Sequence, residues 1–132
     1  MLEKDFVPYE PSLALRELGF DEPCFGYYEP NKVFNYINWE IFKDFPYLAK
    51  NSEWQDLCGA PTYSQAFRWF RDKYKIHSVI NLTIIGTWYF ELYDLNDKRN
   101  AEIKTNQNEF KTPEEAELAC LIKLIEIVKE KK

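Results

Sequence analysis

TPEEAELACLIKLIEIV, residues 112–128, carries the clearest structural signal in the chain. Thr112 is a typical N-cap residue, Pro113 suits the first helical position, and Glu115 completes a capping box. Large apolar side chains then recur at helical spacing and form a wide face: Leu118, Leu121, Ile122, Leu124, Ile125, Ile127 and Val128. A face this wide indicates deep burial, so we expect a long helix that packs against a sheet or a partner.

The residues on the N-terminal side of this helix predict a second one. Thr62 and Gln65 form another capping box, and Pro61 limits how far the helix extends backwards. Aromatic side chains follow on a single helical stripe: Tyr63, Phe67, Phe70 and Tyr74. We therefore expect an amphipathic helix that begins at Thr62.

Two or three strands are expected between these helices. Val79–Ile85 is rich in β-branched residues, Gly86-Thr87 marks a turn, and Trp88–Leu95 shows the alternation of a strand. Residues 101–105 predict a third, more polar strand at an edge. The order helix, strand, strand, strand, helix predicts a small antiparallel sheet packed by two main helices, which is an α+β fold.

The N-terminal half gives weaker signals. Ser12–Leu18 predicts a short helix, Gly19 suits a left-handed residue just after it, and Phe20 falls where the apolar contact of a Schellman motif belongs. Cys24–Tyr28 predicts a strand between two prolines.

Aromatic side chains crowd the segment from Phe25 to Trp54 without a period of 2 or 3.6 residues. Within it, Val33–Phe42 and Pro46–Leu57 fit short helical turns or irregular loop. We therefore expect an irregular, aromatic-rich N-terminal half that packs over the rest of the fold. No linker or repeat divides the chain, so we expect residues 1–132 to form a single domain.

The residue types that carry most catalysis are sparse. Cys24, Cys58 and Cys120 are too widely spaced for a zinc motif and odd in number for a disulfide framework. His77 is the only histidine, and none of the four glycines belongs to a phosphate-binding loop. We therefore expect no catalytic residue, no metal and no cofactor.

The charge and hydropathy of the chain bear on its partners and location. With 22 acidic against 17 basic residues, the formal net charge is −5. This charge repels polyanions, so nucleic acid is disfavoured as a partner. The charged start does not resemble a signal peptide and no apolar run matches a membrane span, so we expect a cytoplasmic protein without a membrane partner.

The element order over residues 62–131 resembles that of the double-stranded RNA-binding domain. In that family the start of the last helix carries lysines that bind phosphates. The corresponding positions here hold Pro113, Glu114, Glu115 and Glu117, which repel phosphates. The resemblance therefore implies a fold, with a nucleic-acid-binding module as the alternative function.

Several short phrases resemble small uncharacterised proteins encoded in phages and mobile elements of Bacteroidetes. They are Phe6-Val7-Pro8-Tyr9-Glu10, Glu17-Leu18-Gly19-Phe20, Glu22-Pro23-Cys24-Phe25, Ala60-Pro61-Thr62-Tyr63, Trp69-Phe70-Arg71 and Glu114-Glu115-Ala116. The likeness spans nearly the whole chain. It implies an accessory protein of a phage or its host, and it assigns no residue a role.

These observations predict a non-enzymatic binding protein that engages a host protein or a small ligand. Tyrosine and tryptophan suit such surfaces, because they bury a large area at little entropic cost and keep a polar atom. The candidate binding residues are Tyr28, Tyr36, Trp39, Trp54, Arg68 and Arg71.

Overall fold

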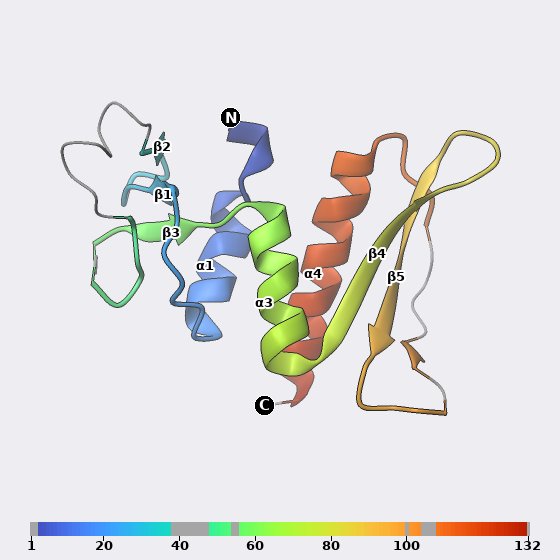
Figure 1. Cartoon of the computed structure of the whole chain (residues 1–132). Coiled ribbons are helices and arrows are strands. Elements are labelled where there is room, and N and C mark those ends of the chain that lie inside the picture. The colour runs from blue at the N-terminus through green and yellow to red at the C-terminus, as the bar shows by residue number, and fades with distance from the viewer. Residues whose placement is uncertain (1–2, 38–47, 54–55, 100, 104–107, 132) are drawn as a thin grey trace. The chain divides into compact units, whose positions relative to one another are not determined.

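A computed structural model of the chain describes residues 3–37, 48–53, 56–99, 101–103 and 108–131. It contains α-helices and two small antiparallel sheets, so the α+β class is confirmed (Figure 1). The chain divides into two compact units, Met1–Gln65 and Ala66–Lys132, and each is described by itself. The expectation of a single domain stays a prediction.

In its described residues, the first unit combines α1 (Tyr9–Glu17) with a three-stranded sheet. The 3-10 helix η1 (Glu3–Asp5) precedes α1. The strands are β1 (Gly26–Tyr28), β2 (Phe34–Tyr36) and β3 (Cys58–Ala60), and they lie in the order β2-β1-β3. Helix α3 (Tyr63–Tyr74) starts at the end of this unit.

Helix α1 ends in the predicted Schellman motif. Gly19 has a φ of 97°, and its N–H donates to the Arg16 carbonyl at 3.0 Å. The Phe20 N–H donates to the Leu15 carbonyl at 2.9 Å, and both of these side chains are buried. The helix begins at Tyr9, earlier than predicted. Pro11 lies in its first turn, where main-chain N–H groups have no helical acceptor, so a proline is tolerated there.

The N-terminal sheet corrects the expectation of an irregular segment. Val33–Phe42 contains strand β2, although helical turns or loop were expected there, and residues 38–47 lie outside the described part of the chain. Lys32 has a φ of 68° and its N–H donates to the Glu29 carbonyl at 2.8 Å, which closes the β1–β2 turn. These turn residues do not form one of the dipeptides that mark hairpins, so the sequence did not reveal this one.

The second unit matches the predicted order of elements. After α3 come β4 (Ile76–Leu82), β5 (Trp88–Asp94), β6 (Glu102–Ile103) and α4 (Pro113–Lys131), and the strands lie in the order β4-β5-β6 (Figure 1). Strand β4 begins and ends three residues before the predicted 79–85. The turn accordingly occupies residues 83–87, where the Thr83 N–H donates to the Thr87 carbonyl at 2.7 Å.

Helix α4 packs on β4 and β5, as its wide apolar face predicted. The buried side chains of the helix are Ala116, Cys120, Leu121, Leu124, Ile125 and Val128. Phe90 and Leu92 of β5 and Ile76 of β4 are buried as well, and they share one face of the sheet. This layer of helix on sheet is the core of the second unit.

Both predicted caps are present. The Thr112 Oγ1 accepts a hydrogen bond from the Glu115 N–H at 3.1 Å, and the Thr62 Oγ1 accepts one from the Gln65 N–H at 3.2 Å. Neither capping box closes in the standard way. The Glu115 carboxylate accepts from the Lys111 N–H at 3.2 Å, one residue before the cap, and the Gln65 amide donates to the Pro23 carbonyl at 2.8 Å.

Replacing Thr112 with alanine removes the cap of α4, so we expect the free energy of unfolding to fall by about 1 kcal/mol. A Thr112→Ser variant keeps the accepting hydroxyl and should retain most of this stability. Urea unfolding followed by circular dichroism measures both. Equal midpoints for wild type and Thr112→Ala would show that the cap contributes nothing.

Candidate functional site

Four aromatic rings in the first unit form a chain of contacts, two of them edge-to-face and one stacked. We call Tyr9, Tyr28, Phe34 and Tyr36 the aromatic row. Successive ring centroids are 5.5 Å apart for Tyr9–Tyr28, 5.4 Å for Tyr28–Phe34 and 6.4 Å for Phe34–Tyr36. The Phe6 ring packs against the row, with its centroid 5.0 Å from that of Phe34. The row runs from the helix to the outer strand of the sheet.

The two ends of the aromatic row differ from its middle. Tyr28 is 6% exposed, and its hydroxyl donates to the Val7 carbonyl at 3.0 Å, so it serves the core and is not the surface ring that we expected. Tyr36 is 47% exposed and stacks on Phe34 with an interplanar angle of 25°. At the other end, the Lys32 amino group lies 5.3 Å from the centroid of the Tyr9 ring. The row therefore presents Tyr36 as a supported, partly exposed ring.

The other four predicted binding residues lie outside the described residues or in the second unit. Trp39 and Trp54 lie outside the described residues, so their role stays a prediction. Arg68 and Arg71 are exposed on α3 in the second unit, and the Arg71 guanidinium lies 3.9 Å from the Asp72 carboxylate. Of the six candidates, the structure therefore brings together Tyr28 and Tyr36, which are joined through Phe34.

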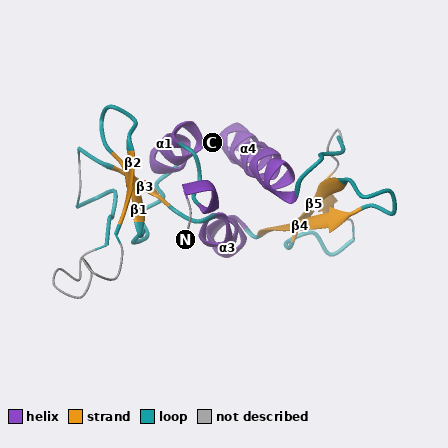
Figure 2. Cartoon of the chain, turned by 90° about the horizontal axis from the view of Figure 1, so that it is seen from above, coloured by secondary structure: helices purple, strands orange, loops and turns teal. Residues whose placement is uncertain are grey.

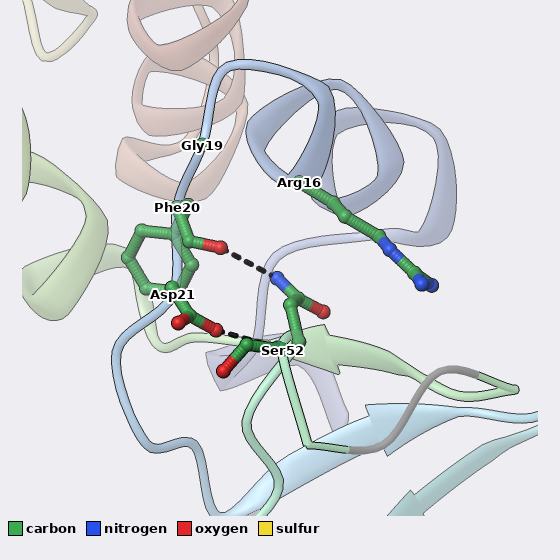
Figure 3. A pocket seen from close by; sticks show the side chains of 6 residues that line it. Arg16, Gly19, Phe20, Asp21 and Ser52 are labelled. Atoms are coloured by element: carbon green, nitrogen blue, oxygen red, sulfur yellow. Dashed lines mark hydrogen bonds between the residues drawn. The ribbon is translucent and has the colours of Figure 1, made fainter.

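A shallow hollow of about 330 Å³ opens at the end of α1 in the first unit (Figure 3). It is lined by Arg16, Gly19, Phe20, Asp21, Asn51 and Ser52. The Asp21 carboxylate accepts from the Ser52 N–H at 2.6 Å, and hydrogen bonds to Ser52 hold the pKa of Asp21 below its usual value. The Arg16 guanidinium donates to the Leu57 carbonyl at 3.0 Å. Both charged side chains thus already bind main-chain groups, and the hollow is open, so it offers a small molecule little enclosure.

Asn51 holds the wall of this hollow together. Its side chain is buried, its amide N–H donates to the Phe20 carbonyl at 2.8 Å, and its amide oxygen accepts from the Gly59 N–H at 2.9 Å. The Asn51 side chain thus provides hydrogen-bond partners for a main-chain carbonyl after α1 and for a main-chain N–H in β3. Nothing in the sequence marked Asn51, because a single asparagine in a loop has no spacing that reveals its partners.

Replacing Asn51 with alanine leaves a buried carbonyl and a buried N–H without partners, so we expect a loss of about 2–3 kcal/mol in unfolding free energy. Ser52→Ala is the control, since this neighbour is exposed, so the hydroxyl bond to Asp21 that it loses is open to water, and its main-chain N–H is retained. Chemical denaturation of both variants provides the measurement. An Asn51→Ala variant as stable as Ser52→Ala would contradict the bridging role.

The sheet of the second unit has a partly exposed face opposite the one that packs on α4. Glu91 lies at its centre, where its carboxylate accepts from the Asn81 amide at 2.8 Å and from the Tyr93 hydroxyl at 2.7 Å. The hydrogen bond to Glu91, which favours the protonated phenol, raises the pKa of Tyr93. This network fixes the orientation of polar groups on an accessible sheet surface.

All three cysteines are buried and free. Burial raises the pKa of Cys24 and of Cys120 to about 12, and it raises the pKa of Cys58 as well. Since the thiolate is the reactive form, none of them is an activated nucleophile. Among the residues that the structure describes, no group of three His, Cys, Asp or Glu side chains could hold a metal ion. None of the described helices is long and apolar enough to cross a membrane.

The raised thiol pKa values predict slow alkylation of the folded protein. At pH 8 the three thiols stay protonated and covered, so iodoacetamide should modify them far more slowly than it modifies a free cysteine peptide. In denaturant all three should react at the peptide's rate, and mass spectrometry counts the adducts. Rapid labelling of one cysteine in the native protein would identify an accessible thiolate and contradict this picture.

Comparisons with known proteins assign no role to these residues, because no family model, curated protein or solved structure matches the chain. The resemblances to phage and mobile-element proteins and to the double-stranded RNA-binding domain therefore stay predictions. The assignment of a site rests on geometry, and the aromatic row offers the most organised surface in the first unit.

Proposed function

We propose that this chain is a non-catalytic binding protein that holds a partner protein against the exposed end of the aromatic row. The observation that carries the proposal is the placement of Tyr36, which is 47% exposed although it stacks on Phe34 and is supported through it by Phe6. A ring already fixed in place loses little conformational entropy when a partner covers it. Tyrosines held in this way are frequent anchors of protein interfaces.

A protein partner fits this surface better than a small ligand does. The row lies on α1 and the sheet, and the hollow at the end of α1 is shallow and open. Small-molecule sites enclose most of the ligand, which this surface does not do. In line with the resemblance to phage and mobile-element proteins, we propose that the partner is a host protein.

The buried thiols support a role without catalysis. Each has a raised pKa, so the usual route to a cysteine nucleophile is closed. The binding proposal requires no reacting group, since it depends on apolar contact alone. The alternative of a nucleic-acid-binding module gains no support from α4, whose first turn carries Glu114 and Glu115.

Replacing Tyr36 with alanine should abolish capture of the partner without unfolding the protein. Tagged wild type, Tyr36→Ala and Ile122→Ala are used to isolate bound proteins from host-cell lysate, with and without nuclease treatment. Ile122 is the matched control, because it is 43% exposed and lies on α4 in the other unit. We expect a specific protein with wild type and Ile122→Ala that is lost with Tyr36→Ala, while the melting temperatures agree within a few degrees.

Two results would overturn the proposal. The first is equal capture by all three proteins, which would place the contact elsewhere. The second is capture that disappears after nuclease treatment of the wild type, which would favour the nucleic-acid-binding alternative. A Tyr36→Phe variant keeps the ring and lacks the hydroxyl. Because the proposed contact is made by the ring, this variant should bind like wild type.

A further inference from the structure

Among the described strands, β4 pairs with β5 alone, along one of its edges. The sheet order β4-β5-β6 places it at the border, and no described strand lies on its outer side (Figure 2). Because the Thr83 N–H donates to Thr87, alternation places the main-chain groups of Asn81, Val79 and His77 towards β5. The N–H and C=O groups of the intervening residues therefore point outward: Ile76, Ser78, Ile80 and Leu82.

This edge lacks the features that keep edge strands from pairing. Proteins protect such edges with lysine, proline, bulges or short strands. Strand β4 has seven residues in continuous register with β5, and it contains no proline. No acidic residue, lysine or arginine occurs between Ile76 and Phe90, although the chain carries a net charge of −5. The strand is therefore a place where two copies of this acidic chain can approach without repulsion.

The sequence of β4, Ile76 to Leu82, matches its own reverse in character at every position except Ser78 and Ile80. Reading IHSVINL from both ends towards Val79, Ile76 corresponds to Leu82 and His77 corresponds to Asn81. Two copies related by a twofold axis at Val79 therefore place apolar opposite apolar and imidazole opposite amide. The outward-pointing groups of Ser78 then face those of Ile80 in the second copy, and Val79 faces Val79. Ile76 is 0% exposed, so the accessible outward groups are those of Ser78 and Ile80, and about four main-chain hydrogen bonds can form in this register.

The hairpin tip adds apolar surface at both ends of this strand pair. Leu82 is 58% exposed, Ile84 is fully exposed and Ile85 is 74% exposed. The Thr83 and Thr87 hydroxyls bind each other at 2.7 Å and the Thr87 N–H donates to Thr83, so the polar groups of the turn face inward. In the twofold arrangement each tip extends past the start of β4 of the other copy. An apolar tip of this kind is unusual on a protein that remains a single copy.

We propose that β4 is a self-association edge, at which two copies of this chain pair antiparallel about Val79 and join their three-stranded sheets into one continuous sheet. The pairing is isologous, so it closes after two copies and leaves no further edge of the same kind. It involves the second unit and does not depend on the proposed partner surface at Tyr36.

A cysteine at Val79 tests both the pairing and its register. In a pair without direct hydrogen bonds, opposite Cα atoms lie about 4.5 Å apart, which is within the range that a disulfide spans. The side chain of residue 79 lies on the partly exposed face of the sheet, because Val79 is opposite Glu91, and the native thiols are buried. Diamide treatment of Val79→Cys should therefore give a nearly complete covalent dimer on non-reducing gels at micromolar concentration.

Neighbouring positions provide the register control. His77→Cys and Asn81→Cys should not cross-link alone, but a mixture of the two should, because His77 faces Asn81 of the other copy. Cross-linking of Val79→Cys with His77→Cys in place of self-linking would overturn the proposed register. A wild type that light scattering shows to be a single copy at about tenfold higher concentration, together with no Val79→Cys dimer, would overturn the association itself.

A proline at Ser78 tests the edge without using cysteines. Its N–H points outward, so Ser78→Pro removes a donor needed by the second copy while the β4–β5 bonds remain. Ser78→Ala is the matched control, since it loses the same hydroxyl and keeps the N–H. We expect half the wild-type mass for Ser78→Pro and the full dimer mass for Ser78→Ala and for Tyr36→Ala. If Ser78→Pro does not fold, the cysteine series still decides the question.

Discussion

The apolar face of α4 must be covered, and most features of the second unit follow from this requirement. Leu121, Leu124 and Val128 are completely buried, and β4 and β5 are the strands on which the helix packs. One face of the sheet is therefore committed to Ile76, Phe90 and Leu92. The opposite face is left for polar side chains such as Glu91 and Tyr93, and β4 lies at the border of the described sheet.

Local signals predicted the second unit well, because its elements are stabilised by contacts between residues close in sequence. The Thr112 cap, the acidic first turn and the helical spacing of α4 are properties of adjacent turns. The Schellman motif at Gly19 belongs to the same class. The end of β4 was misplaced, because Ile84 and Ile85 have strand-forming side chains but lie in the turn closed by Thr83 and Thr87. The glycine that follows Ile84 and Ile85 was the sequence feature that could have indicated a turn at these two residues.

The first unit was harder to predict, because partners distant in sequence hold it together. Strand β3 is Cys58-Gly59-Ala60, which has no strand-like composition, yet it pairs with β1 and is buried. Asn51 connects Phe20 with Gly59 through bonds that no spacing indicates. Tyr28 and Tyr36 were recognised as candidates by residue type, but only the stack through Phe34 shows that one belongs to the core and the other to the surface.

The contact between Phe6 and Gly26 also constrains how this protein can change during evolution. A Cβ atom at Gly26 would lie 2.6 Å from Cδ1 of the Phe6 ring, so no larger residue fits while that ring remains. A descendant that gains a side chain at 26 must first lose the ring at 6, and with it the support beneath Phe34. The two positions should therefore vary together or not at all. A large ring followed twenty positions later by glycine, ahead of a tyrosine pair, is thus a signature by which divergent relatives could be found.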